Sequence, residues 1–116
     1  MNATKELHGG VDEKALATVA AAAEPTRLTI LFLLGQKGRM CVGDIARRFK
    51  ASRPAISHHL KVLKNCTLVE AEREGQEIYY SVQTGRVIDT LRALADSLER
   101  CCAPGSPRQR QAGGVR

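Results

Sequence analysis

The stretch CVGDIARRFKASRPAISHHLKVLKNC, residues 41–66, decides the fold of this chain. Its first part, residues 41–49, predicts a short helix with apolar residues at helical spacing. Ser52 is a good helix N-cap, and Pro54 suits a first helical turn, where its missing N–H costs nothing. A second helix therefore begins there and runs to Cys66. Two short helices joined by a tight turn predict a helix-turn-helix, in which the second helix is the recognition helix.

Two further helices are predicted before this stretch. Residues 11–23 read as a first helix, and residues 25–34 as a second, with proline in its first turn and Gly35 at its stop. Residues 28–34 are almost all apolar. A helix that is apolar on nearly every side must be buried, so we expect it to form the core of the domain.

The hydrophobic period changes after the recognition helix. Residues 68–74 and 76–82 alternate between apolar and polar and flank a turn with Gly75 near its centre, which predicts a β-hairpin, or wing. A last helix follows, with six apolar residues at helical spacing: Val87, Ile88, Leu91, Leu94, Ala95 and Leu98. The order is α-α-α-α-β-β-α, a mainly α fold with a small β-hairpin (α+β), which is the winged helix-turn-helix.

The composition predicts one domain with a tail at each end. Residues 1–10 are expected to be a flexible N-terminus, and residues 11–102 a DNA-binding and dimerisation domain. Residues 103–116 contain two prolines and three arginines without an acid, which predicts a disordered basic tail. No segment reads as a secretory signal or a membrane span, so we expect a cytoplasmic protein without a membrane partner.

Positive charge is concentrated around the recognition helix. The chain has a net charge of +6, and residues 43–64 hold six Lys and Arg side chains against the single acid Asp44. Concentrated positive charge is typical of a surface that binds a polyanion. A solvated basic face without a partner is the alternative.

The helical period separates a buried from an exposed face of the recognition helix. At about 100° per residue, Ile56, Leu60 and Leu63 define the buried face. His58 points away from the core, where it can meet DNA or remain solvated. His59 lies along the core margin, and we expect it to be a structural residue bonded to a neighbouring backbone group. A metal site formed by both is disfavoured, because helical metal pairs use i, i+4 spacing.

Four motifs, in order along the chain, resemble the ArsR/SmtB family of winged helix-turn-helix repressors. They are AEPTRLTILFLL, MCVGDIARRF, SRPAISHHLKVLK and EREGQEIYYSV, and the resemblance covers about residues 15–100. It implies a homodimer that packs through its first and last helices. It also implies a transcriptional repressor that binds an operator and leaves it when an inducer binds.

The apolar stripe of the last helix supports a dimer independently, because such a stripe can meet its own symmetry mate. Two-fold symmetry would place the recognition helices about 34 Å apart on a pseudo-palindromic DNA duplex. Carboxylates near phosphate repel, so Glu74 at the hairpin tip should make the wing contribute less than the recognition helix. The expected DNA contacts are Ser52, Arg53, Ser57, His58, Lys61 and Lys64, and the match to the family's wing adds Arg73 and Gln76.

The four cysteines are expected to be reduced, because the chain carries no export signal. Thiolates with few usable histidines favour soft ions. Three sulfurs, from Cys66, Cys101 and Cys102, could bind As(III), Cd(II) or Pb(II) as an inducer that folding does not require. The site could lie within or between subunits. Cys41 is most simply a small buried residue at a helix start, and Cys66 could likewise belong to the core.

The resemblance also ranks the ligand sets that members of the family use. The zinc-type site of the last helix is absent, because no histidine follows His59. The Cys-x-Cys type of the third helix is incomplete, because Gly43 takes its second place. Cys66 matches one of two recognition-helix positions in cadmium- and lead-sensing members. Adjacent C-terminal cysteines resemble those of arsenic-sensing members.

Three other functions are alternatives to a metal-responsive repressor. Exposed adjacent thiols could instead sense oxidants or persulfide, within the same fold. A winged-helix domain could serve protein–protein interaction, and steep loss of DNA affinity with salt would argue against that. An enzyme is disfavoured, because no nucleophile is paired with an activating base.

Overall fold

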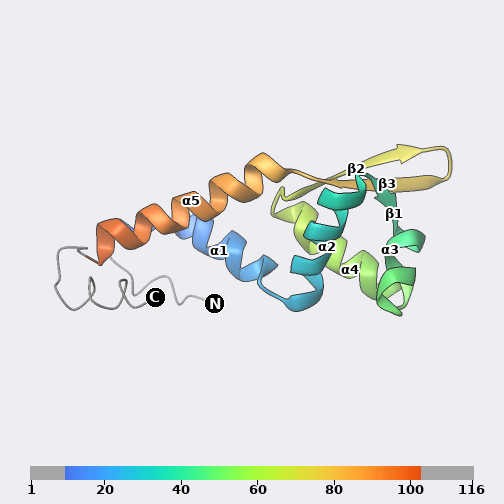
Figure 1. The fold of residues 1–116 in the computed structure, drawn as a ribbon, viewed down its shortest axis with the longest axis horizontal. Helices are drawn as coiled ribbons and strands as arrows, with labels where there is room; N and C mark the ends of the chain where they lie inside the picture. Colours follow the sequence, from blue (N-terminus) through green and yellow to red (C-terminus); the bar gives the residue numbers. More distant parts are fainter. Residues whose placement is uncertain (1–9, 103–116) are drawn as a thin grey trace.

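The computed structural model describes residues 10–102, which form helices and short strands in the order α1-α2-β1-α3-α4-β2-β3-α5 (Figure 1). The predicted α+β winged helix-turn-helix is confirmed. The predictions of a flexible N-terminus and a disordered tail fall largely or wholly on residues 1–9 and 103–116, outside the described part. The elements are α1 (Glu13–Ala22), α2 (Pro25–Lys37), β1 (Met40–Cys41), α3 (Val42–Phe49), α4 (Arg53–Asn65), β2 (Val69–Glu74), β3 (Glu77–Val82) and α5 (Thr84–Cys101).

One core joins α2, α3, α4 and the sheet. Side chains with less than 2% exposure come from all of them, so the helix-turn-helix is fixed against α2 on one side and the hairpin on the other. The side chains are Ile30, Leu34, Ile45, Ile56, Leu60, Leu63 and Val69.

The predicted end and burial of α2 are wrong. The helix continues to Lys37 and ends at Gly38, whose φ of +84° suits glycine, whereas Gly35 lies inside the helix. Two apolar side chains of α2 are exposed, Leu28 by 42% and Phe32 by 72%. The helix is therefore buried on one side only, and its other side carries apolar surface toward α5.

The wing is a three-stranded sheet in the order β1-β3-β2 rather than a two-stranded hairpin. The pair Met40↔Tyr80 joins β1 to β3, and Gly75, with a φ of +66°, turns β2 into β3. Two residues are too few for alternation to show in a sequence, which is why β1 escaped prediction. Because β1 pairs with β3, the segment directly before α3 is part of the same sheet as the wing.

The last helix projects beyond the core and packs on α1 (Figure 1). The backbone N–H of Asp12 donates to Ser97 Oγ at 2.8 Å, and Arg100 Nε donates to the Gly10 carbonyl at 3.1 Å. Ser97, with 3% exposure, is the one buried residue of α5. Between residues 10 and 102, no single helix is long and apolar enough to cross a membrane. The helices α1 and α2 meet both criteria only when they are taken together, and the chain bends by 91° between them.

Candidate DNA interface and thiol sites

The recognition helix α4 is capped as its sequence predicts. Ser52 Oγ accepts a hydrogen bond from the Ala55 backbone N–H at 3.2 Å, and Pro54 lies in the first turn. Ile56, Leu60 and Leu63 are completely buried. The six side chains expected to contact DNA from this region are all exposed: Ser52, Arg53, Ser57, His58, Lys61 and Lys64.

The turn between α3 and α4 needs no glycine. Lys50 adopts a left-handed conformation with φ +52° and ψ +40°, and its backbone N–H closes α3 on Ala46. Left-handed backbone is uncommon for residues other than glycine, asparagine and aspartate, so Lys50 carries some strain. The exposed side chain of this lysine adds positive charge at the turn.

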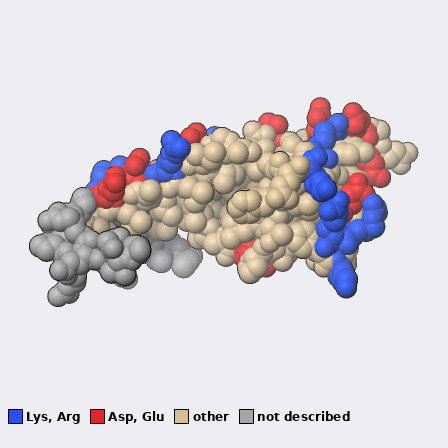
Figure 2. Space-filling model, viewed as in Figure 1, with Lys and Arg blue, Asp and Glu red and all other residues tan. Residues whose placement is uncertain are grey.

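Lysine and arginine side chains gather in a band across the helix-turn-helix end of the molecule (Figure 2). Carboxylates flank the band on the wing side, and others lie along α5 and at the lower middle of this view. The exposed cations of α3 and the turn are Arg47, Arg48 and Lys50. Arg47 pairs with Asp44, the single acid of this segment. No carboxylate of the segment is left to neutralise the other cations, so their charge can attract a polyanion.

His59 has a structural role, as expected, but the expected partner is wrong. Its Nδ1 accepts from Arg27 Nε at 3.1 Å, so the partner is a side chain of α2 rather than backbone. Glu24 Oε1 lies 3.8 Å from the same nitrogen. Arg27 also donates to the Ala21 carbonyl at 2.7 Å and so joins the end of α1 to α4.

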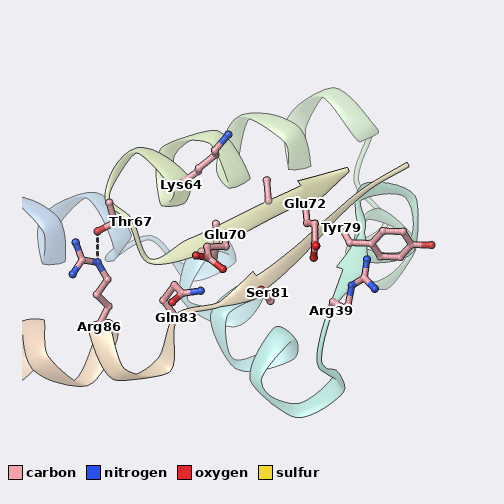
Figure 3. Close-up of a pocket in the computed structure, with 11 residues that line it drawn as sticks. Arg39, Lys64, Thr67, Glu70, Glu72, Tyr79, Ser81, Gln83 and Arg86 are labelled. Atoms are coloured by element: carbon pink, nitrogen blue, oxygen red, sulfur yellow. Dashed lines mark hydrogen bonds between the residues drawn. The ribbon is translucent and has the colours of Figure 1, made fainter. Parts of the chain in front are cut away.

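The register of the wing separates its charges by face. Glu70, Glu72 and Glu74 share one face of β2, and Arg73 lies on the other. Figure 3 shows Glu70 and Glu72 on the same side as Tyr79 and Ser81, over a polar hollow of about 640 Å³.

Arg39 neutralises the carboxylate of Glu74 at the wing tip, an ion pair that the sequence did not predict. Its Nη2 lies 3.0 Å from Glu74 Oε1, and its Cζ lies 4.3 Å from the centre of the Tyr79 ring. Arg39 was not predicted from the sequence. It lies next to β1, whose pairing with β3 brings it close to the wing, and β1 was not predicted either. Arg73 and Gln76 are exposed at the wing, and Arg73 Nη1 donates to the Gly75 carbonyl at 3.4 Å.

The four cysteines lie in three environments and none forms a disulfide. Cys41 is buried in β1, as expected of a small core residue. Cys66 is half-buried at the C-terminal cap of α4, beside Lys14, Arg86 and Asp89. The adjacent thiols at the end of α5, Cys101 and Cys102, are exposed.

One chain does not bring the three predicted sulfur ligands together. No group of three Cys, His, Asp or Glu side chains in residues 10–102 could hold a metal ion. Cys66 lines a hollow beside Ala93, and Cys101 is about 12 Å further along the α5 axis. A three-sulfur site would therefore need a second chain or a change of structure.

An apolar groove runs between α2 and α5. Its cavity of about 360 Å³ has almost no polar lining. It continues over α1 into a second apolar hollow of about 220 Å³. The large side chains exposed along the groove are Leu28, Phe32, Ile88 and Leu91, and Leu98 is exposed further along α5.

Comparison with known proteins gives a consistent group of relatives. The sequence profile described as "Bacterial regulatory protein, arsR family" matches residues 24–71. The Transcriptional repressor SdpR of Bacillus subtilis is 41% identical over 80 residues, which are 69% of this chain and 88% of that protein. The Arsenical resistance operon repressor of the same species is 34% identical over 82 residues, 71% of this chain and 73% of that one.

Solved structures agree with this group. A crystal structure described as a possible transcriptional regulator for arsenical resistance superposes with a TM-score of 0.67 at 33% identity. The match covers 85% of this chain and 95% of that one. The shared fold thus includes the wing and the helices on either side of it.

Proposed function

Because the chain belongs to the arsR family of bacterial regulatory proteins, and is thus a DNA-binding transcriptional repressor and not an enzyme, we propose how it binds DNA and what releases it from DNA. It binds a pseudo-palindromic operator in the cytoplasm as a homodimer. It leaves that operator when a thiophilic metal or metalloid ion occupies its cysteines. Family membership favours DNA binding over the alternative of a winged-helix protein–protein module.

The division of α4 into two faces is the observation that carries the DNA-binding residues. Three leucine and isoleucine side chains of this helix have 0% exposure, whereas Ser57, His58 and Lys61 are exposed on the other side. Base edges in the major groove are read by such short polar and cationic side chains on a helix fixed by its own core. Ser52, Arg53, Lys64, Arg73 and Gln76 are proposed to add phosphate or minor-groove contacts.

The apolar groove supports the homodimer and widens its expected surface. The first and last helices were expected to pair, and α2 adds Leu28 and Phe32 to the same exposed surface. Contiguous apolar patches are uncommon on monomers and mark interaction sites. A second copy of the chain buries this patch through an isologous contact.

Thiolate chemistry supports a soft ion as the inducer. Cys66, Cys101 and Cys102 are the proposed ligands, and sulfur ligands favour As(III), Cd(II) or Pb(II) over hard cations. Buried Cys41 is left out of the set.

We propose that the site lies between subunits, and two-fold symmetry supports this arrangement. The exposed side chains Ile88 and Leu98 of α5 are centred on residue 93. If two α5 helices pair antiparallel about that point, Cys101 of the partner subunit comes beside residue 85. Arg86, the next residue, lines the hollow that holds Cys66. Each dimer would then hold two equivalent sites.

The position of Cys66 couples ion binding to DNA binding. Its backbone N–H donates to the Val62 carbonyl at 3.2 Å, so the thiol is carried on the end of the recognition helix. An ion shared by Cys66 and α5 of the partner subunit fixes α4 relative to the dimer axis. If that orientation differs from the one that fits DNA, ion and DNA oppose each other's binding to the same degree.

A titration tests the inducer. Reduced protein, bound to a fluorescent duplex selected from a random library, is titrated separately with As(III), Cd(II) and Pb(II). Sulfur-to-metal absorbance should saturate at two ions per dimer as the fluorescence anisotropy of the DNA falls. Cys41→Ser is the matched control and should respond like the wild type, whereas Cys101→Ser/Cys102→Ser should bind DNA but not release it.

Mixed dimers distinguish a site between subunits from one within a chain. A dimer of one Cys66→Ser chain and one Cys101→Ser/Cys102→Ser chain keeps one complete set of ligands only if the ligands come from different subunits. We expect it to bind one ion, while each parent homodimer binds none with full coordination. A mixed dimer that binds no ion would contradict the shared site.

Thiol oxidation or persulfide formation is a second candidate for induction, favoured by the exposure of adjacent Cys101 and Cys102. It predicts no absorbance with any of the three ions. It also predicts release of DNA by peroxide or persulfide and its restoration by a thiol reductant.

A further inference from the structure

Gly43 and Arg53 touch each other across the helix-turn-helix. Gly43 is the second residue of α3 and is buried, and Arg53 is the first residue of α4. A β-carbon built on Gly43 would lie 2.3 Å from Arg53 Nη2 and 3.0 Å from its Cζ. The guanidinium therefore lies directly over the α3 backbone, in space that exists because residue 43 has no side chain.

The Arg53 guanidinium lies against the α3 backbone without an ion pair in the described part of the chain. No hydrogen-bond acceptor or carboxylate among residues 10–102 is bonded to Arg53. The acid of α3, Asp44, pairs with Arg47 instead. An arginine carries five N–H donors, so this one lies over the α3 backbone with its donors available to a ligand.

We infer that Gly43 is a positioning residue for DNA recognition: it lets α3 hold the Arg53 guanidinium in advance at the start of the recognition helix. The inference rests on the proposed contact between Arg53 and DNA. Fixing an arginine before binding removes part of the side-chain entropy that binding would otherwise cost. A guanidinium fixed as a flat fork also matches the geometry of a phosphate or of a guanine edge.

The contact explains why the fold should tolerate a larger residue while DNA binding should not. The atoms that an alanine methyl would meet are the far end of a flexible side chain, which can swing away. Alanine is also a better helix former than glycine. Gly43→Ala should therefore fold and should displace only the Arg53 guanidinium.

The test is a double-mutant cycle on the selected duplex, with affinities from fluorescence anisotropy and stability from urea unfolding. Gly43→Ala should weaken binding about two- to tenfold, the range for ordering one long side chain. In the Arg53→Ala background the same substitution should change affinity less than about 1.5-fold, because residues that share one contact are not additive. Gly43→Ala with Lys61→Ala is the control and should give the product of the two separate effects.

The outcomes separate this inference from the proposed function. Wild-type affinity for Gly43→Ala, with a weakened Arg53→Ala, would overturn the positioning role and leave the Arg53 contact standing. An undiminished Gly43→Ala effect in the Arg53→Ala background would overturn it as well. Wild-type affinity for Arg53→Ala would remove the proposed contact itself.

Discussion

The recognition helix α4 and the last helix α5 treat their apolar residues in opposite ways. Ile56, Leu60 and Leu63 of α4 have 0% exposure, whereas Ile88 and Leu91 of α5 are 43% and 53% exposed. The one buried residue of α5 is a serine. The apolar face of α4 is therefore completely buried within one chain, whereas α5 presents an apolar surface that one chain leaves exposed.

This difference assigns the two proposed tasks. A DNA-reading helix must hold its exposed side chains steady, and complete burial of its other face does that. A surface that pairs two copies must be apolar and exposed in each copy before they meet. Four pairs of substitutions test this division of roles.

The largest effect is expected in the core of α4. Leu60→Ala should lower the free energy of unfolding by about 2–5 kcal/mol, because it leaves a cavity at a completely buried position. Leu98→Ala, at a position 60% exposed, should change it by less than about 0.5 kcal/mol when measured at concentrations where the chain is monomeric. Urea unfolding followed by circular dichroism checks both. Equal losses would mean that α5 is as well packed within one chain as α4.

The next effect is expected at the surface of α5. Leu91→Glu places a carboxylate in the groove, and we expect the dissociation constant of the dimer to rise by about a hundredfold. DNA affinity should fall with it. Arg92→Glu adds the same carboxylate at the next helical position and should leave the dimer largely intact. Sedimentation equilibrium measures both, and a dimer unaffected by Leu91→Glu would remove this groove from the interface.

A smaller effect separates stability from DNA contact within α4. Ser52→Ala removes the N-cap hydrogen bond to Ala55 and should cost about 1 kcal/mol of unfolding free energy. Ser57→Ala should leave stability unchanged and weaken DNA binding, because this exposed serine caps nothing. Thermal unfolding and anisotropy on the same samples give both quantities. A Ser57→Ala variant with full affinity would contradict its proposed contact.

The smallest effect is expected at the wing. Arg39 and Glu74 should be coupled by about 0.2–1 kcal/mol in a double-mutant cycle, because the pair is exposed to solvent and screened. Arg39→Ala should also weaken DNA binding by leaving Glu74 unneutralised, and adding Glu74→Gln should restore part of that loss. If the second substitution restored nothing, Glu74 would not face the DNA backbone.

Local signals in the sequence were enough for most of the fold. Ser52 and Pro54 located the start of α4, and the alternation around Gly75 located the hairpin, since both depend on neighbouring residues. The end of α2 was misplaced because Gly35 and Gly38 look alike in sequence and differ only in backbone conformation. The strand β1 was missed because its pairing with β3 joins residues about forty positions apart.

The candidate site followed the same division. The helical period correctly placed Ile56 inside and His58 outside. It could not predict that Arg39 lies beside Glu74 or that Arg53 lies over Gly43. Each of these contacts joins two different elements, and only the tertiary fold brings those elements together. The separation of Cys66 from Cys101 was likewise invisible until α5 was placed.

The most direct test of the central claim is the stoichiometry of the DNA complex, measured by sedimentation velocity on the selected duplex with the wild type and Leu91→Glu. If α4 reads DNA and α5 pairs the copies, the wild type should bind as two chains per duplex. Leu91→Glu should bind far more weakly, as single chains. One wild-type chain per duplex, or equal affinity for the two proteins, would contradict the account.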